Sequence, residues 1–310
     1  MAQHKNNDRR LFLKKTCWGM AGAFCAPNLI MAGSSSTRTK NIPINAHLWV
    51  YASKFPPHWD CTPILETVFA DLNYSGMSGL ELMEGQLRHD DSVKRINELI
   101  KKYELPVSGS SYGVGFEMWD KSQHKAILKD IETVVPRLGK VGGTTFGISV
   151  GSKDGLKTET ELDDQAALLK KIRSICADNG IVANLHNHTY EVENDMHDLK
   201  GSLARLPDFP LGPDLNWLIR AGIDPVQFIN TYGEQIVYLH IRDQYKNGTW
   251  SEYVGQGNTD FQAIGLALKA QNFSGQAAVE LAFPNDFVPE NELREDWKMS
   301  REFIQKTFDW

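Results

Sequence analysis

The sequence contains few cysteines and few long apolar runs. Of its four cysteines, Cys17 and Cys25 fall within the first 32 residues, which leaves Cys61 and Cys176 in the rest of the chain. Two distant cysteines form neither a disulfide framework nor a cysteine metal site. We expect a pair of buried thiols and leave open a single bridge formed after export. No stretch beyond residue 32 approaches the roughly 20 apolar residues that span a bilayer.

An excess of positive charge is also absent. The chain has 33 Lys and Arg against 39 Asp and Glu, a formal net charge of −6. This balance disfavours attraction to nucleic acid or to anionic lipid, so we expect no nucleic-acid partner. No G-x-G-x-x-G motif follows a strand pattern; Gly113 and Gly115 come closest but lack the third glycine. Dinucleotide binding is therefore disfavoured.

The first 32 residues have the pattern of a bacterial export signal. Arg9 and Arg10 precede a mildly apolar stretch that ends in small residues, which resembles the twin-arginine class. Cleavage after Ala32 would leave residues 33–41 as a flexible mature N-terminus. Residues 1–32 hold five basic residues and one acidic residue, so their removal changes the formal charge from −6 to −10. The sequence thus predicts a periplasmic or otherwise exported protein without a stable membrane partner, or a membrane-anchored one if the signal is uncleaved.

From residue 42 onward, short apolar runs alternate with longer amphipathic stretches, as in repeated β-α units around a parallel sheet. We expect strands at 42–47, 79–83, 106–110, 143–149, 181–186, 211–215, 236–240 and 276–281. Helices are expected at 92–102, 164–178, 224–231, 261–270 and 292–307. Eight strands with intervening helices over roughly 270 residues predict a single (β/α)8 TIM barrel at 42–310, with its active site at the carboxyl ends of the strands.

Metal-binding residue types stand at the ends of the last four expected strands. Two imidazoles and two carboxylates at equivalent positions would converge at one mouth of the barrel and form a first shell for a divalent cation. These four residues are His186, Asp214, His240 and Glu280. The alternative, in which each polar residue is separately hydrogen-bonded or solvated, would suit one such residue better than four in a row.

Several short motifs in this region resemble those of the xylose isomerase-like sugar epimerases and isomerases, a TIM barrel family that includes metal-dependent DNA-repair endonucleases. The resemblance spans roughly residues 42–307 and depends on the order and spacing of the motifs. The motifs are His186-Asn187-His188, Asp214-Leu215-Asn216-Trp217, Ala221-Gly222-Ile223-Asp224-Pro225, His240-Ile241-Arg242-Asp243, Gly255-Gln256-Gly257 before Asp260-Phe261, and Val279-Glu280.

The resemblance implies a divalent metal, with Mn, Mg, Co, Zn and Fe all open. Its ligands would be an acid after the fifth strand, an Asp after the sixth, a His after the seventh and a Glu after the eighth. Asp214, His240 and Glu280 match these types, whereas His186 stands in place of the first acid. Because many of the epimerases use two carboxylates on opposite faces of a sugar carbon, this departure weakens the epimerase interpretation. A neutral imidazole can still bind metal or act as a base.

The implied chemistry is proton removal next to a carbonyl that the metal polarises. Glu280 is the first candidate base and His188 the second. Trp217 and Trp49 are candidates to stack on a sugar ring, although core packing would explain them equally well. Further candidate contacts to substrate are Glu81, His47, Arg242 and Glu191. Glu84 and His89 are expected in a solvent-exposed loop.

Three functions follow from these observations. The first is an exported, metal-dependent carbohydrate isomerase or epimerase acting on a small carbohydrate. The alternative is a 3-keto-glycoside lyase or hydratase, which needs one good base rather than two matched carboxylates. The third is a glycan-binding barrel without catalysis. A nuclease is disfavoured by the acidic charge and by Trp217, which stands where related endonucleases carry a His. A homo-oligomer is left open.

Overall fold

A computed structural model describes residues 41–113, 115–284 and 286–310. The predicted export signal and residues 33–40 lie outside the described residues. The strands are β1 (Ile44–His47), β2 (Gly79–Met83), β3 (Val107–Tyr112), β4 (Thr145–Ile148), β5 (Val182–Leu185), β6 (Tyr238–Ile241) and β7 (Gln276–Val279). Seven of the eight expected strands therefore form as regular strands.

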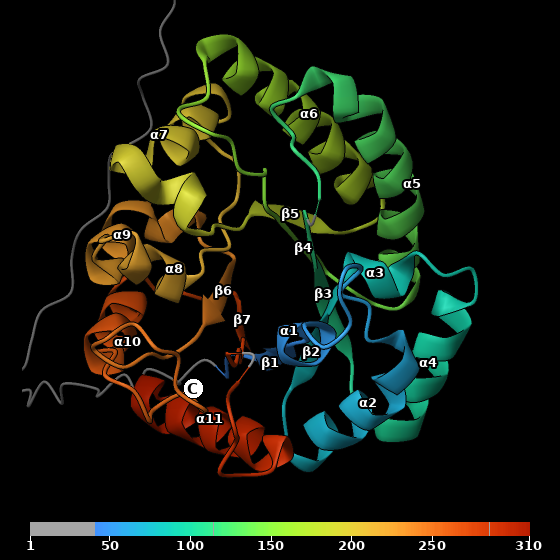
Figure 1. Cartoon of the computed structure of the whole chain (residues 1–310), viewed down its shortest axis with the longest axis vertical. Helices are drawn as coiled ribbons and strands as arrows, with labels where there is room; N and C mark the ends of the chain where they lie inside the picture. The colour runs from blue at the N-terminus through green and yellow to red at the C-terminus, as the bar shows by residue number, and fades with distance from the viewer. Residues whose placement is uncertain (1–40, 114, 285) are drawn as a thin grey trace, which may run out of the picture. The chain divides into compact units, whose positions relative to one another are not determined.

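All strand pairs are parallel, and the sheet order is β5-β4-β3-β2-β1-β7-β6. The helices surround this sheet on the outside (Figure 1). Residues 210–214 lie between the two ends of the sheet, where Leu211 bridges to Leu185 on one side and to Ile236 on the other. The fold is therefore the predicted TIM barrel.

The expected strand at 211–215 is reduced to isolated bridges, and its sequence explains why. Pro210 and Pro213 have no backbone N–H to donate to a neighbouring strand. The N–H groups that remain are used: Leu211 donates to Gln235 O (2.9 Å) and Gly212 to Leu185 O (2.8 Å). Only glycine fits at position 212, because a Cβ there would lie 1.9 Å from Asn184 Oδ1. The barrel closes through these few hydrogen bonds.

The outer layer contains long and short helices. The helices of at least six residues are α2 (Leu65–Tyr74), α4 (Ser92–Tyr103), α5 (His124–Lys140), α6 (Glu159–Asp178), α7 (Thr189–Arg205), α8 (Leu215–Arg220), α9 (Pro225–Tyr232), α10 (Phe261–Ala270) and α11 (Leu293–Phe308). The short ones are α1 (Trp49–Ala52), α3 (Glu84–Leu87), η1 (Thr62–Ile64), η2 (Lys121–Gln123) and η3 (Gly233–Gln235). Within the described residues, none of the helices is both long enough and apolar enough to cross a membrane.

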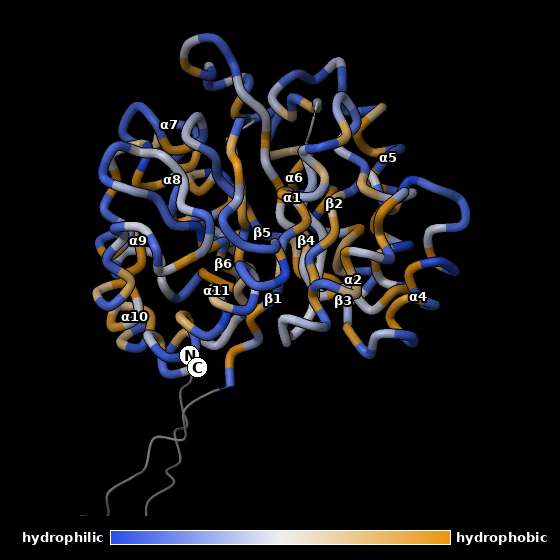
Figure 2. The backbone as a smooth tube through the Cα atoms, turned by 60° about the horizontal axis from the view of Figure 1, so that its bottom comes forward, coloured by the Kyte–Doolittle hydropathy of each residue, from blue (hydrophilic) through white to orange (hydrophobic). Residues whose placement is uncertain are grey.

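The helix ends follow local capping chemistry. Helix α6 begins five residues earlier than expected because Thr158 caps it: Thr158 Oγ1 accepts from Glu161 N–H (3.3 Å), and Glu161 accepts from Thr158 N–H (2.7 Å). Helix α4 buries Ile96 and Leu99 and exposes its lysines, so it packs as an amphipathic surface helix. The tube coloured by hydropathy shows this alternation of apolar and polar positions along the outer helices (Figure 2).

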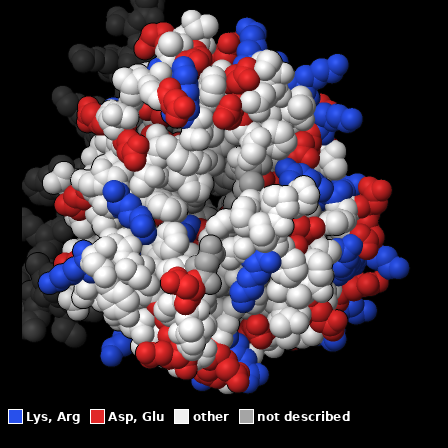
Figure 3. All heavy atoms as spheres, viewed as in Figure 1, with Lys and Arg blue, Asp and Glu red and all other residues white. Residues whose placement is uncertain are grey.

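The core contains both remaining cysteines. Cys61 and Cys176 are buried free thiols, and burial raises the pKa of each to about 12. The prediction of buried thiols is confirmed, and no bridge joins them. On α11, Trp297 is fully buried and donates from Nε1 to Tyr51 Oη at 3.0 Å, which ties the last helix to the segment after β1. Charged side chains of both signs are spread over the face shown in Figure 3, and neither sign gathers around its central hollow.

Candidate metal centre and active site

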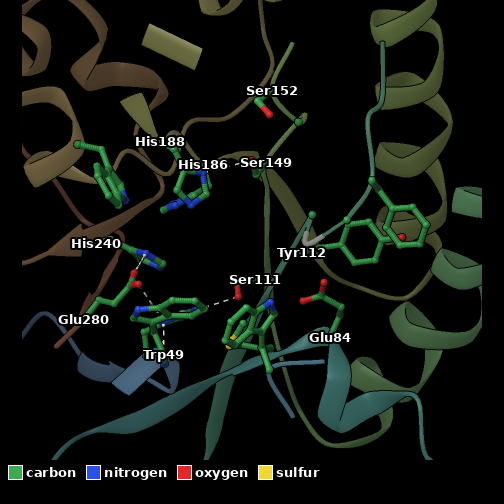
Figure 4. Close-up of a pocket in the computed structure, with 18 of the residues that line it drawn as sticks. Trp49, Glu84, Ser111, Tyr112, Ser149, Ser152, His186, His188, His240 and Glu280 are labelled. Carbon is green, nitrogen blue, oxygen red and sulfur yellow. Dashed lines mark hydrogen bonds and ion pairs between the residues drawn. The ribbon is translucent and has the colours of Figure 1, made fainter. Parts of the chain in front are cut away.

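The strand-end residues predicted from the sequence lie together at one end of the barrel, where His186, His240 and Glu280 line a cavity of about 550 Å³. Asp214 is fully buried beside His186 and His240. Figure 4 shows His186, His188, His240 and Glu280 together on one side of it. The barrel explains this convergence, because the carboxyl ends of all its parallel strands meet at one mouth. His186 follows β5, Asp214 ends the bridging segment at 210–214, His240 lies in β6 and Glu280 follows β7.

Three of these residues form a group that can hold a metal ion. Ligand atoms of His186, Asp214 and His240 all lie within 4.8 Å of one another, and all three residues are buried. Nδ1 of His186 is buried without a hydrogen-bond partner. Two imidazoles and a carboxylate suit zinc, iron or manganese, and an unpaired buried nitrogen is the atom that a cation would satisfy. The residues present therefore fit a divalent metal.

Glu280 lies next to this group rather than within it. Its Oε2 is 2.8 Å from His240 Nδ1, and its other oxygen accepts from Arg242. Burial alone would raise the pKa of Glu280, but Arg242, His47 and His240 together hold it well below its ordinary value. The carboxylate is thus ionised, with both oxygens engaged.

His240 stands between two carboxylates. Its Nε2 lies 2.7 Å from Glu81 Oε2, while its Nδ1 faces Glu280. Burial lowers the pKa of His240, but the two glutamates outweigh this and raise it to about 10. A metal ligand must give up its proton, so metal binding at His240 would release one. Glu81, expected to contact a sugar hydroxyl, instead holds His240 in place.

Arg242 bridges the two acidic residues of the site. Its Nε donates to Asp214 Oδ2 at 3.1 Å, and it also donates to Glu280. The Arg242 guanidinium lies 5.1 Å from the Trp217 ring centre and 5.3 Å from that of Trp250. Asp214 has a second task, because its Oδ1 accepts from the N–H groups of Asn216 and Trp217 and caps α8.

His188 is the imidazole of the cavity with the most open surroundings. Its side chain is 34% exposed, and its Nδ1 lies 3.0 Å from Tyr190 Oη and 3.3 Å from Ser149 Oγ. Glu191 lies behind it, 3.5 Å from Nδ1, and accepts from the His188 backbone N–H at 2.6 Å. With one ring nitrogen held, the other is left for the cavity.

Glu191 is buried and does not line the cavity. It accepts from Ser149 Oγ and from Val150 N–H (3.1 Å) in addition to its contacts with His188. Burial would raise its pKa, but hydrogen bonds from His188 and Ser149 lower it overall. The sequence suggested a contact to substrate here, whereas the structure gives Glu191 the position of a residue that orients His188.

Aromatic residues line much of the cavity wall. Trp49 and Trp217, the two tryptophans expected near substrate, both line it. Trp49 packs on Trp59 with ring centres 5.5 Å apart, and Trp217 packs on Trp250 at 5.6 Å. His47 also lines the cavity; its Nδ1 accepts from Trp49 N–H (3.2 Å), so its Nε2 donates to Ser111 Oγ (2.9 Å).

The sequence analysis missed several lining residues from the first half of the chain. Glu84 was expected in solvent but is 2% exposed and lines the cavity, because α3 begins directly after β2 and turns inward. His89 is exposed, as expected, and pairs with Asp60 at 2.6 Å. Other missed lining residues include Tyr112, Phe116 and Ser149, together with Tyr190 from the second half of the chain. Position in the sequence could have identified two of them, since Tyr112 and Ser149 stand at the carboxyl ends of the third and fourth strands.

Comparisons with known proteins agree with this fold. A family model described as xylose isomerase-like TIM barrel matches residues 69–307. No curated protein matches the chain. Among solved structures, a sugar phosphate isomerase/epimerase from Parabacteroides distasonis ATCC 8503 has a TM-score of 0.67 at 16% identity, covering 87% of this chain and 96% of that one.

Two further structures are similar to the same extent. The 3-keto-D-glucoside 4-epimerase from E. coli has a TM-score of 0.67 at 17% identity and covers 86% of this chain and 99% of that one. A D-allulose 3-epimerase from Methylomonas sp. has a TM-score of 0.65 at 19% identity and covers 86% and 98%. At such identities the likeness concerns the fold.

Proposed function

The chain belongs to the xylose isomerase-like TIM barrel family, and we propose that it is a divalent-metal-dependent carbohydrate isomerase or epimerase. The observation that carries the proposal is the group of His186, Asp214 and His240, whose ligand atoms lie within 4.8 Å of one another at the mouth of the barrel. The names of the similar structures, all sugar isomerases or epimerases, support the substrate class. A bound metal would supply polarisation of a carbonyl and so make a neighbouring C–H proton acidic.

The residues of the chain supply the proton transfer. His188 is exposed to the cavity and oriented by Glu191, so we assign it the removal of the proton. Glu280 has both oxygens bound by Arg242 and His240 and is the second candidate. Return of the proton by a different group on the opposite face gives epimerisation, and transfer between neighbouring carbons gives isomerisation.

A second candidate function is elimination from a 3-keto-glycoside. His188 would take the proton from the carbon next to the ketone, the electron pair would form a carbon–carbon double bond, and the glycosidic carbon–oxygen bond would break. The departing oxygen would take up a proton and leave as an alcohol. The observation in its favour is that one well-oriented imidazole is enough, whereas Glu280 is held by a guanidinium and an imidazole.

The proposed function is tested by NMR in deuterated water. The purified protein is supplied with Mn²⁺, Mg²⁺, Co²⁺, Zn²⁺ or Fe²⁺ in turn and offered ketoses and 3-keto-glycosides. Deuterium entering one carbon without bond cleavage supports an isomerase or epimerase, and release of the aglycone supports the lyase. Sugar binding that persists unchanged after chelation, without exchange under any metal, would leave only a binding protein.

Variants make the assignment specific. His188→Ala should abolish deuterium exchange, while His89→Ala, which changes an exposed imidazole outside the cavity, should leave it intact. Asp214→Asn should lose bound metal but keep its fold, because the Asn side-chain oxygen can still cap α8. Full activity in both His188→Ala and Asp214→Asn would overturn the site.

Export is a separate proposal, supported by Arg9, Arg10 and the apolar stretch that follows them. Fractionation of cells that express the full chain should place the protein outside the cytoplasm. Replacing both arginines with lysine should retain it inside, and retention of the unaltered chain would contradict the proposal.

A further inference from the structure

The cavity extends well beyond the metal-binding residues. Figure 4 shows Tyr112 and Glu84 on the side opposite His186, His240 and Glu280, with Ser111 between the two groups. Its volume of about 550 Å³ lies in the range of pockets that enclose drug-sized ligands, larger than a single sugar ring. A sugar held at the metal-binding residues would therefore leave the far half of the cavity unfilled.

The far half has an aromatic wall in which Phe116 is partly exposed and rests on Tyr112, which is 3% exposed. Tyr112 and Phe116 stack with ring centres 5.7 Å apart and planes 10° apart. Behind them, Tyr112 packs on Phe146 at 5.3 Å and donates from Oη to Asp130 Oδ2 at 3.0 Å. Aromatic faces bind the apolar faces of rings, and this pair is supported from behind.

Gly113 and Met118, two described residues on either side of Phe116, make close backbone contacts with the neighbouring loop. Gly113 and Gly151 have φ of +138° and +87°, and a Cβ at either would lie within 2.7 Å of backbone oxygen on the other loop. Met118 is buried and donates from its N–H to Val150 O at 3.0 Å. The aromatic wall is thus held in place rather than formed on binding, which lowers the entropic cost of using it.

The charge of the lining disfavours a phosphorylated ligand. Among the described lining residues Arg242 is the single Lys or Arg, and Asp214 and Glu280 already engage it. His240, whose pKa is raised, lies between Glu81 and Glu280. The far half contributes two carboxylates, Glu84 and Glu117. Arg88 lies behind Phe116, is bound to Asp130 through Nε at 3.0 Å and a terminal nitrogen at 2.8 Å, and also lies 3.7 Å from Glu84 Oε1. A phosphate would meet carboxylates here, whereas sugar hydroxyls would find acceptors.

From these observations we infer that the region around Tyr112, Phe116 and Glu84 is a second subsite for an uncharged sugar ring. The substrate is then an unphosphorylated disaccharide or the end of an oligosaccharide, with its reacting ring at the metal-binding residues and its second ring on the aromatic wall. The inference rests on the proposed function for the reacting ring. It assigns to the second ring a platform for its apolar face and a carboxylate for its hydroxyls.

The inference is tested by binding, which requires no turnover. The Mg²⁺-supplied protein is titrated with cellobiose, maltose, trehalose and sucrose, and in parallel with D-glucose, D-fructose and glucose 6-phosphate. At least one disaccharide should bind at least about tenfold more tightly than its component sugars and the phosphate, the effect expected of one additional stacked ring. Saturation-transfer NMR should show contact with both of its rings.

Matched variants locate the second ring. Phe116→Ala should weaken the disaccharide at least about tenfold and leave the monosaccharides unchanged. Glu84→Gln, which keeps the size of the side chain, should weaken it in the same way. Tyr74→Ala removes an exposed aromatic ring on α2 that does not line the cavity. It should change neither the affinity for the disaccharide nor that for the monosaccharides.

Two results of this titration would overturn the subsite: equal affinity for disaccharides and monosaccharides, or tighter binding of glucose 6-phosphate than of every disaccharide. A third is tighter binding of p-nitrophenyl glucoside, titrated in the same way, because its second ring is aromatic and not a sugar. Failure of the proposed function looks different. In that case disaccharides bind through both rings, but no carbon of any sugar or 3-keto-glycoside exchanges deuterium under any metal.

Discussion

Arg242 donates from Nε to Asp214 Oδ2 at 3.1 Å, so the one carboxylate of the candidate metal group is already paired with a cation of the protein. The same guanidinium donates to Glu280. A divalent ion that binds there meets a site whose negative charge has been partly cancelled, and the number of uncompensated charged ligands is one of the factors that set cation affinity.

Arg242→Met should therefore tighten Mn²⁺ binding by about tenfold or more, because it frees two buried carboxylates. Isothermal titration with Mn²⁺ measures this directly. Arg220→Met is the matched control, since Arg220 stacks on the same two indoles, 5.3 Å from Trp217 and 4.7 Å from Trp250, and should leave the affinity unchanged. Weaker Mn²⁺ binding by Arg242→Met would mean that the guanidinium positions the ligands instead.

Glu191 should act through His188. Glu191→Gln removes the charge that faces His188 Nδ1 at 3.5 Å but retains an acceptor, so we expect kcat to fall by about tenfold to a hundredfold, less than in His188→Ala. KM should change little, because Glu191 does not line the cavity. Glu193→Gln, an exposed neighbour, is the control. An unchanged kcat in Glu191→Gln would reduce Glu191 to a structural role.

A buried ion pair outside the cavity should dominate local stability. Lys157 Nζ donates to Asp198, to Gln165 Oε1 at 2.8 Å and to Gly151 O at 2.9 Å, which holds the β4–α6 loop against α7. Asp198→Asn leaves the ammonium without its counter-charge and should lower the free energy of unfolding by about 3–5 kcal/mol. Urea denaturation measures the loss. Asp309→Asn, in an exposed pair with Lys269, should cost less than about 0.5 kcal/mol.

Asp296 should make stability depend on pH. Burial, and then the nearby carboxylate of Glu252, raise its pKa from 3.8 to about 7. Between these values the folded state binds a proton that the unfolded state does not. The contribution of Asp296 is thus fully present below the unfolded pKa and is lost as pH rises through about 7.

Asp296→Asn should remove this dependence and make the protein more stable at pH 8 than the unaltered chain, by roughly 1 kcal/mol or more. Urea denaturation at pH 5 and pH 8 provides the comparison. Asp178→Asn, at an exposed position near the end of α6, should leave the difference between the two pH values as it was. If the stability of Asp296→Asn depends on pH as strongly as that of the unaltered chain, another group is responsible for the effect.

The sequence predicted the barrel and the positions of the strand-end residues because parallel strands place their ends together whatever the details of packing. It did not predict that the segment at 210–214 closes the barrel through bridges, although its two prolines carried that information. Glu84 was misplaced because an acidic residue after a strand looks like a loop residue. Its burial depends on how α3 turns, which no local pattern encodes.

The far half of the cavity could not be predicted from the sequence either. Tyr112 ends β3 and Phe116 lies in the loop that follows, but their distance from the metal-binding residues depends on which strands become neighbours across the barrel. The orienting role of Glu191 likewise depends on tertiary structure. Glu191 lies in α7, after β5, and contacts Ser149, which follows β4. Sequence patterns identify such residues singly, whereas their partners are set by the tertiary fold.

The two thiols have a consequence for where this protein can mature. Both Cys61 and Cys176 are sealed in the interior, and each is held in its protonated, unreactive form at neutral pH. The barrel needs no oxidant to reach its final form, and afterwards it exposes neither of these thiols to oxidation. It can therefore be completed in a reducing environment and carried into an oxidising one without any change in its covalent structure.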